Sequence, residues 1–271
     1  MNSFNGKSVL VTGAASGVGK ALSIELASRG AEVFVTALTG GEARPVAEAI
    51  VATGGLAHAM KCDVTENEDI RNAIDVVVQQ CGKLDLIINN AGLLYIGEFT
   101  DMDEAFLKKI YGVNFTAVSM GCYFALKQMK KQGHGHIVNI ASMAGLLPSP
   151  GMAAYASSKH GVVGLSKSLQ AECTALGIKV QVACLSNVES DLIDGAECKT
   201  GHNDVYRKLF PKPQTSAGAA KKLADGMRSS RLFLYSPFNA RVAAAVYRIS
   251  PRLMQWSCGL MMKRYREDVQ R

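Results

Sequence analysis

The sequence predicts an α/β fold: a doubly wound parallel sheet with helices on both faces, followed by a helical C-terminal extension. Two observations predict it. Short apolar runs typical of buried strands alternate with longer stretches in which apolar residues recur three and four positions apart. A glycine-rich turn joins the first strand to the first helix. A chain of 271 residues is long enough for one such domain with a full core.

The first half of the chain carries strand–helix units in strict alternation. Parallel strands need crossover connections of this kind, so the alternation favours a parallel sheet. The expected strands are Lys7–Thr12, Glu32–Ala37, Ala57–Cys62 and Leu84–Asn89. The expected helices are Lys20–Arg29, Glu42–Thr53, Asn67–Cys81 and a long one over about Met102–Lys131.

The second half continues the pattern with strands at Gly135–Ile140, Gly177–Cys184 and Arg231–Tyr235. Pro148 and Pro150 exclude helix between Gly145 and Gly151, and a long helical pattern begins near Met152. Residues 185–213 mix polar and apolar positions and are expected to form a flap over the strand ends. Two helices, Ala240–Ile249 and Leu253–Val269, follow, so we divide the chain into a domain at 1–235 and an extension at 236–271.

Composition excludes several classes of protein. No apolar run approaches the roughly twenty residues of a membrane span, and the first residues lack a signal-peptide layout. The seven cysteines are scattered without a C-x-x-C pair, which indicates reduced thiols and a cytoplasmic protein. The five histidines form no ligand cluster, so we expect no metal site.

The positive charge is concentrated in the tail. From Arg228 onward nine basic residues face two acidic ones, an excess equal to the whole chain's net charge of +7. The final helix carries Trp256 and other apolar residues beside Lys263, Arg264 and Arg266, a pattern that suits peripheral contact with an anionic membrane. Packing on the chain's own domain or on a partner subunit remains the alternative. No nucleic-acid reader module accompanies the charge, so we expect no nucleic-acid partner.

Tyr155 and Lys159 lie four residues apart, on one face of a predicted helix. A free tyrosine has a pKa near ~10, and a nearby ammonium in a partly desolvated cleft favours the phenolate. Such a tyrosine can donate or accept a proton near neutral pH. Ser142 follows the strand at Gly135–Ile140, where open α/β sheets place their ligands, and its hydroxyl can hold a substrate oxygen. An ordinary surface Tyr–Lys pair is the alternative.

The glycine-rich turn, with Gly13, Gly17 and Gly19, lets the backbone approach a pyrophosphate at a helix N-terminus. After the second strand there is neither the acidic residue that holds the ribose of NAD nor a basic residue for NADP. Thr36 and Thr39 can hydrogen-bond a phosphate, and no carboxylate repels it, which favours NADP over NAD.

Taken together, these residues resemble the short-chain dehydrogenase/reductase family, over about residues 6–235. Thr12–Gly19 matches the TGxxxGxG turn of the family, Asp63-Val64 its adenine-side contact, and Asn89–Gly92 its NNAG motif. Asn114, Ser142, Tyr155 and Lys159 match its catalytic set, including the thirteen-residue step from serine to tyrosine. The resemblance implies a Rossmann-type dinucleotide-binding domain. On sequence alone, Asn114 in the middle of a helix reads most simply as a surface residue.

The resemblance implies hydride transfer between nicotinamide and a carbonyl or alcohol carbon. It implies that Tyr155 passes the proton and that Lys159 lowers its pKa and binds the nicotinamide ribose. Ser142 would hold the substrate oxygen, and Asn114 would anchor a relay water. The implied cofactor contacts are Gly13, Ser16, Val18, Gly19, Thr39, Asp63, Val64, Asn90, Gly92, Tyr155, Lys159 and Val188.

The second strand's end is also similar to the bacterial 3-oxoacyl-carrier-protein reductases, which use NADPH, but those carry an arginine where this chain has Ala15. Two further departures stand out. The family's usual Pro-Gly after the sixth strand is replaced by Leu185-Ser186, and the glycine-rich last strand that helps build tetramers is absent. We therefore expect a homodimer through the two long helices.

The positions expected to face substrate are mostly apolar, which favours a steroid-, retinoid- or acyl-like alcohol or carbonyl compound over a sugar. They are Leu93, Leu94, Tyr95, Met143, Leu147, Pro148, Met152, Leu185 and Leu192. The alternative to an enzyme is a cofactor-binding regulatory or scaffold protein of the same fold without turnover, for which the missing Pro-Gly is the one supporting feature.

Overall fold

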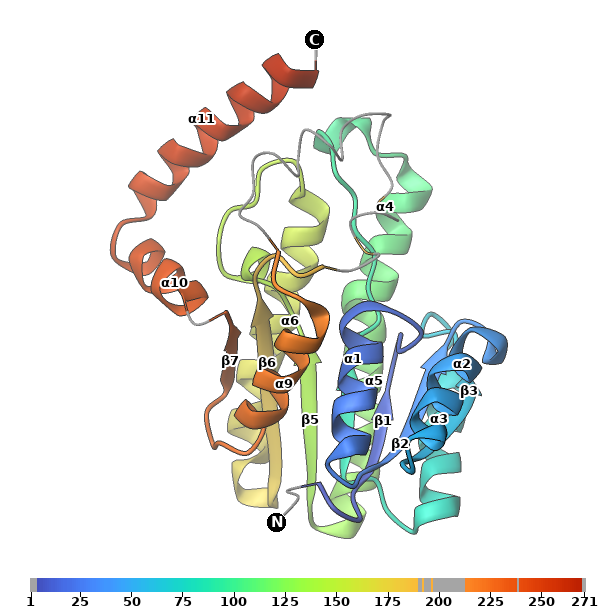
Figure 1. Cartoon of the computed structure of the whole chain (residues 1–271). Helices are drawn as coiled ribbons and strands as arrows, with labels where there is room; N and C mark the ends of the chain where they lie inside the picture. Colours follow the sequence, from blue (N-terminus) through green and yellow to red (C-terminus); the bar gives the residue numbers. More distant parts are fainter. Residues whose placement is uncertain (1–3, 190–191, 193–195, 197–212, 238, 270–271) are drawn as a thin grey trace.

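The computed structural model describes residues 4–189, 192, 196, 213–237 and 239–269. Within these residues the strands form one parallel seven-stranded sheet of order β3-β2-β1-β4-β5-β6-β7 (Figure 1). The strands are β1 Ser8–Val11, β2 Glu32–Ala37, β3 Leu56–Lys61, β4 Leu86–Asn89, β5 Gly135–Ile140, β6 Ile178–Leu185 and β7 Phe233–Ser236. The predicted doubly wound parallel sheet is confirmed.

Helices cover both faces of the sheet, and each face has its own apolar core. On one face lie α1 Gly17–Ser28, α2 Gly40–Ala52 and α9 Ser216–Gly226. On the other lie α3 Asn67–Cys81, α5 Ala117–Gln132 and α6 Ala153–Cys173. Leu10 and Phe34 of the central strands are fully buried, which explains why these strands read as continuous apolar runs.

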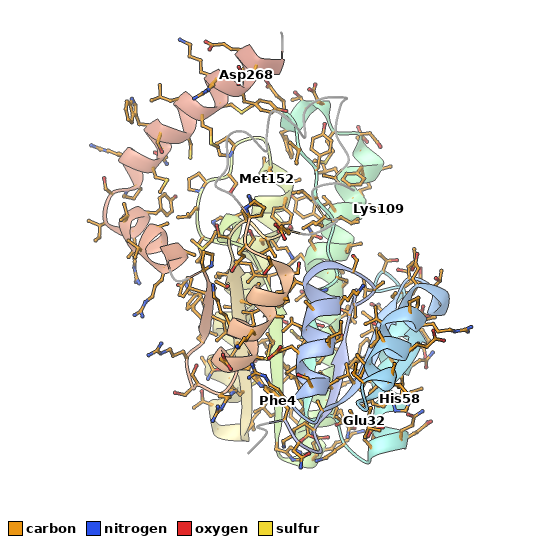
Figure 2. The ribbon with its side chains drawn as sticks, viewed as in Figure 1. Phe4, Glu32, His58, Lys109, Met152 and Asp268 are labelled. Atoms are coloured by element: carbon orange, nitrogen blue, oxygen red, sulfur yellow. The ribbon has the colours of Figure 1, made fainter. Side chains whose placement is uncertain are left out.

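The strand order reverses between β1 and β4, which are neighbours in the sheet although two strands separate them in sequence. At such a switch point the connections leave in opposite directions and open a crevice beyond the carboxyl ends of the strands. Figure 2 places Met152 at this end of the molecule, whereas Phe4, Glu32 and His58 lie at the opposite end. The candidate site therefore belongs to the upper end of the sheet as drawn.

The structure corrects several expected boundaries and adds one helix. The long helix expected from Met102 begins as α4 Glu104–Tyr111 and passes through a π-helical turn, Gly112–Thr116, before α5. Strand β6 continues to Leu185, and α9 was not expected at all. The small residues of α9 give a weak hydrophobic pattern, but Ala219 and Leu223 are buried in the core that contains α1. The expected flap at 185–213 lies mostly outside the described residues.

The C-terminal extension consists of α10 Asn239–Ile249 and α11 Pro251–Val269, as expected apart from one or two terminal residues. In Figure 1, α10 follows the edge strand β7, and α11 runs diagonally from α10 toward the upper end of the molecule, beyond the ends of the strands. Within the described residues, no helix combines the length and apolarity that crossing a bilayer requires.

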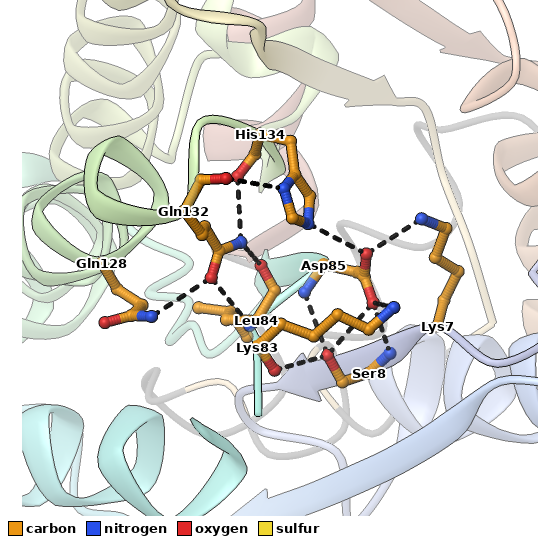
Figure 3. Close-up of polar contacts among 8 residues, drawn as sticks. All are labelled: Lys7, Ser8, Lys83, Leu84, Asp85, Gln128, Gln132 and His134. Carbon is orange, nitrogen blue, oxygen red and sulfur yellow. Dashed lines mark hydrogen bonds and ion pairs between the residues drawn. The ribbon is translucent and has the colours of Figure 1, made fainter. Parts of the chain in front are cut away.

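A polar cluster closes the opposite end of β1 and β4, around the buried carboxylate of Asp85 (Figure 3). The carboxylate of Asp85 forms ion pairs with Lys7 at 2.9 Å and with Lys83 at 3.0 Å. The backbone N–H of Ser8 donates to it at 3.1 Å. Burial alone raises the pKa of Asp85, but the bonds from Lys7, Lys83 and Ser8 outweigh burial and hold the pKa below its ordinary value.

We predict that Asp85→Asn lowers the free energy of unfolding at neutral pH by about 1–3 kcal/mol, because the buried N–H of Ser8 and the partly exposed ammonium groups of Lys7 and Lys83 lose their charged acceptor. The folded-state pKa of Asp85 lies below its unfolded value of 3.8. The stabilisation of the fold by ionised Asp85 is therefore complete above that unfolded value and is lost as the pH falls through the folded-state pKa. Urea unfolding at pH 7 and at low pH should show the difference between wild type and variant shrinking with acid. The exposed Glu68, replaced by Gln, is the control expected to change little, and a pH-independent difference for Asp85→Asn would contradict the account.

Candidate active site

Ser142, Tyr155 and Lys159 come together at the carboxyl ends of β5 and β6. Ser142 caps a short 3₁₀ turn, Met143–Gly145: its hydroxyl accepts the N–H of Ala144 at 3.1 Å and donates to the carbonyl of Leu185 at 3.4 Å. Tyr155 and Lys159 lie in the first two turns of α6, and their exposed fractions are 8% and 3%. Both side chains thus point into the domain, against the alternative of a surface pair.

Close backbone packing fixes where α6 lies relative to Ser142. A Cβ on Gly145 would lie 2.6 Å from the carbonyl oxygen of Lys159, so only glycine lets the 3₁₀ turn touch the helix there. The ammonium of Lys159 donates to the carbonyl oxygen of Ile140, the last residue of β5, at 2.9 Å. Its Nζ atom lies 5.7 Å from the centre of the Tyr155 ring. The sheet therefore holds the lysine, and the lysine lies against the phenol ring.

Asn114 lies in the π-helical turn and is fully buried, so the interpretation of Asn114 as a surface residue is wrong. Its Oδ1 accepts the N–H of Leu93 at 2.7 Å, and its Nδ2 donates to the carbonyl of Leu93 at 2.8 Å. A Cβ built on Gly92 would lie 3.4 Å from Asn114 Oδ1 and 3.7 Å from Lys159 Nζ. The amide and the amine thus border the same small space beside Gly92. π-turns of this kind often occur at functional sites.

A network of buried polar side chains links α6 to strands β4 and β5. Asn89 at the end of β4 donates to Asn139 Oδ1 of β5 at 2.8 Å, and Asn139 donates to Ser166 of α6 at 3.0 Å. All three residues are at most 3% exposed. A Cβ on Gly121 of α5 would lie 2.2 Å from Asn89 Oδ1. The network joins two strands to the helix that carries Tyr155. Sequence reasoning missed it, although polar residues inside apolar strands were its signal.

Burial dominates the acid–base properties of the pair. It raises the pKa of Tyr155, and a hydrogen bond with the Ser142 side chain offsets this in part. Burial also lowers the pKa of Lys159 to about 8. The expected lowering of the Tyr155 pKa by Lys159 is not seen in this structure. Burial removes water from the charged form of each group, which disfavours the phenolate of Tyr155 and the ammonium of Lys159 alike. Both groups nevertheless depart from their ordinary pKa values, which is common in active sites.

The glycine-rich turn has the shape that a dinucleotide needs. Gly13 adopts a φ of +60°, and a Cβ there would lie 2.7 Å from the backbone of Ala91. A Cβ on Gly19 would lie 2.4 Å from the side-chain nitrogen of Asn90, which itself donates to the carbonyl oxygens of Thr12 and Gly13. Ser16 begins α1 without a side-chain capping bond to its first N–H groups. The uncapped N–H groups at the start of α1, and the space left by the missing side chains of Gly13 and Gly19, fit a bound pyrophosphate.

The expected adenosine contacts are found in different environments. Thr36 is fully buried and donates to the carbonyl of Val11 at 3.0 Å, so its hydroxyl cannot serve a cofactor phosphate as expected. Thr39 is exposed and forms a capping box with Glu42 at the start of α2, which brings a carboxylate to this strand end. Asp63 accepts the N–H and hydroxyl of Thr65. Val64 lines a small recess with Thr12, Asn89 and Ala91.

Val188, expected near nicotinamide, is buried and forms an isolated parallel bridge with Gln214. It packs in the core cluster that also contains Leu185 and the apolar residues of α1. Ser186, at the position of the missing Pro-Gly, donates its N–H to the carbonyl of Ser236 at 2.9 Å. The replaced motif is thus held in the sheet region by an ordinary backbone hydrogen bond.

Eight of the nine expected substrate-facing residues divide into two groups, and the ninth, Pro148, is partly exposed and belongs to none of the core clusters of the described residues. Those that form one apolar cluster with Tyr155 are Leu93, Leu94, Tyr95, Met152 and Leu192. Met143 and Leu147 instead pack with the core on the α3–α6 face, and Leu185 packs with the core on the other face. Ile96, Phe106 and Ile110 join the Tyr155 cluster and were not expected. An apolar surface therefore lies directly beside the phenol.

The sequence model described as short chain dehydrogenase matches residues 7–199. A cyclohexanol dehydrogenase from Acinetobacter is 36% identical over 71% of this chain and 77% of that protein. Epidermal retinol dehydrogenase 2 from Mus musculus is 31% identical over 86% of this chain and 74% of that protein. A short chain dehydrogenase/reductase from Burkholderia phymatum, solved in complex with NAD, superposes with a TM-score of 0.85 at 24% identity, covering 93% and 96% of the two chains.

Proposed function

The chain belongs to the short-chain dehydrogenase family of oxidoreductases, and on this premise we propose that it interconverts a hydrophobic secondary alcohol and its carbonyl compound. The observation that carries the proposal is the burial of Tyr155 and Lys159 beside an apolar cluster. Two relatives are named for cyclohexanol, a secondary alcohol, and retinol, a primary one, and both names support the apolar character of the substrate. A scaffold without turnover is not favoured, because all four positions of the expected catalytic set are filled.

When bound, a nicotinamide cofactor supplies or takes up the hydride. The protein's own residues handle the proton. In carbonyl reduction Tyr155 donates its phenolic proton to the substrate oxygen, and in alcohol oxidation the phenolate accepts it. The hydroxyl of Ser142 donates a hydrogen bond to the same oxygen while charge develops there. The amine of Lys159 is held by the Ile140 carbonyl, and while this amine carries its proton its positive charge stabilises the phenolate.

Asn114 acts by position in this proposal. Its amide fixes the backbone of Leu93, and its Oδ1 borders the space beside Gly92 that Lys159 Nζ also borders. A water molecule bridging these two groups would pass protons between Lys159 and solvent. The glycine turn around Gly13 and Gly19, with Asn90, would hold the cofactor phosphates. The homodimer expected from the sequence stays a prediction.

We predict that Tyr155→Phe lowers kcat for the oxidation of cyclohexanol by roughly 10²–10⁴-fold, because the proton acceptor is lost while the ring still fills its place. The rate of NADH or NADPH formation, followed by absorbance, measures this. Tyr111→Phe is the matched control: Tyr111 borders the same cluster but bonds Ser157 at 2.7 Å, and its variant should keep near wild-type kcat. Equal rates in the Tyr155 variant and wild type would overturn the proposed role.

We also propose that NAD binds more tightly than NADP, in place of the NADP preference that the sequence suggested. That preference assumed two available threonines and no carboxylate. Thr36 is buried, and the Glu42 carboxylate accepts the N–H of Thr39 at 3.0 Å. A carboxylate at this strand end repels the extra phosphate of NADP and suits a ribose hydroxyl.

We predict a larger rise in Tm with NAD than with NADP at equal concentration, measured by thermal unfolding. Glu42→Gln should increase the response to NADP, because glutamine keeps the capping box while removing the charge. Glu48→Gln, on the exposed side of the same helix, is the control. A larger response to NADP in wild type, unchanged in Glu42→Gln, would refute this preference.

We further propose that the outward faces of α10 and α11 bind anionic membrane surfaces. On α10, Val242, Val246 and Ile249 recur at helical spacing and are 55%, 42% and 85% exposed. On α11, Trp256 and Leu260 are 64% and 50% exposed. Basic residues flank both stripes, namely Arg241, Arg248, Arg252 and Lys263. A second copy of this surface would place like charges opposite each other, whereas anionic lipid is complementary.

Sedimentation with vesicles tests this surface. We predict that the protein sediments with phosphatidylglycerol vesicles but not with phosphatidylcholine vesicles, and that high salt releases it. Replacing Ile249 and Trp256 by Gln should weaken binding, whereas Leu56→Gln, which removes an exposed leucine on β3, should not. No sedimentation with either lipid, or a salt-sensitive dimer without lipid binding, would exclude the membrane proposal.

A further inference from the structure

The final helix α11 is attached to two loops that border Tyr155. Arg266 forms a two-point ion pair with Glu98, with Nε–Oε1 at 2.7 Å and Nη2–Oε2 at 3.1 Å. Cys258 Sγ lies 3.8 Å from the carbonyl oxygen of Pro148. Glu98 follows the residues Leu93–Ile96 of the Tyr155 cluster, and Pro148 lies between Ser142 and Tyr155.

The two loops are also joined to each other. The N–H of Gly97 donates to the carbonyl of Gly151 at 2.9 Å. Glu98 is the next residue after Gly97, so the ion pair with Arg266 acts on the segment that this hydrogen bond already fixes. The helix therefore contacts two connected loops near the end of the sheet where the strands terminate. Figure 1 shows the direction in which α11 runs.

One face of α11 is turned toward these loops. Met254, Cys258, Met261 and Tyr265 recur at spacings of four, three and four residues, which places them on one side of a helix. Tyr265 is 4% exposed and the other three are partly buried. Trp256 and Leu260, on the opposite side, are the exposed residues described above.

Two of the four residues on this inward face are methionines, Met254 and Met261, and both are only partly buried. Like Cys258 and Tyr265, they belong to none of the three core clusters that the described residues form. Their flexible, polarisable side chains can adapt to apolar groups of different shape. Partly exposed methionines beside two loops of the site are therefore more typical of a surface that contacts a ligand than of a packed core.

We infer that α11 is the outer wall of the substrate site and that Met261 on its inner face contacts the apolar part of the substrate, remote from the reacting oxygen. This inference rests on the proposed alcohol oxidation. The ion pair between Glu98 and Arg266 positions the wall, so these two residues act through α11 and not on the substrate. A long apolar chain reaches the wall, whereas a small ring does not.

Kinetics with two alcohols test the wall. Met261→Glu raises KM for decan-2-ol by roughly tenfold or more, because a carboxylate in an apolar contact is unfavourable, while KM for cyclohexanol and both kcat values change little. Leu260→Glu, one residue away on the outward face, leaves both KM values unchanged. Equal effects of the two variants, or an equal change for both alcohols, would overturn the inference. Met261→Ala is the milder variant that keeps the fold, with a smaller rise in KM for decan-2-ol alone.

The ion pair has its own test. Glu98→Arg raises KM for decan-2-ol and makes the single tryptophan, Trp256 on α11, more sensitive to quenching by acrylamide. The exchanged pair Glu98→Arg with Arg266→Glu restores both, whereas Arg264→Gln changes neither. Failure of the exchanged pair to restore either property would show that the ion pair does not position α11.

A measurement without turnover separates this inference from the proposed function. Decan-2-ol raises Tm of the cofactor-bound wild type, and Met261→Glu loses that rise while Leu260→Glu keeps it. This result supports the wall even where no alcohol is oxidised, a case in which the proposed function alone fails. An equal rise in Tm in wild type and Met261→Glu overturns the wall, whatever the turnover.

Discussion

The site depends on one buried contact: the amine of Lys159 held between the end of strand β5 and the ring of Tyr155. An amine that burial brings to a pKa of about 8 must have a fixed acceptor, and the carbonyl of Ile140 provides it at 2.9 Å. Gly145 lets the turn after β5 touch α6 at the backbone of Lys159 itself. The Asn89–Asn139–Ser166 network ties the same helix to two strands. The proposed chemistry therefore requires that sheet and helix keep their mutual position.

Local periodicity was sufficient for much of the fold and for part of the site. The bounds of β2, α3 and β5 follow from the sequence because apolar runs and helical spacing are local properties. Tyr155 and Lys159 share a face because a helix has a fixed repeat. The burial of Asn114 was not predictable in this way, since a π-turn leaves no periodic signal. The same holds for α9, whose small residues matter only through what they pack against, and for Thr36, whose hydroxyl is used inside the sheet.

The tail shows what a local pattern leaves undecided. Its amphipathic spacing was compatible with a membrane or with the chain's own domain, and the two faces of α11 now suggest a separate partner for each. Arg266 and Glu98 are 168 residues apart, so no local signal could pair them. The ion pair is largely exposed, and its own contribution to stability is small. Its importance lies in where it holds the helix.

The central claim is that Tyr155 is held buried beside Lys159 at the end of the sheet, and the pKa of that phenol tests it most directly. NMR of protein carrying labelled tyrosine follows the phenol signal of Tyr155 through a pH titration, with the Tyr155→Phe spectrum giving the assignment. In the protein without cofactor the account predicts a pKa for Tyr155 above the ordinary 10.0, because burial outweighs the hydrogen bond with Ser142. A pKa at or below that ordinary value would contradict it.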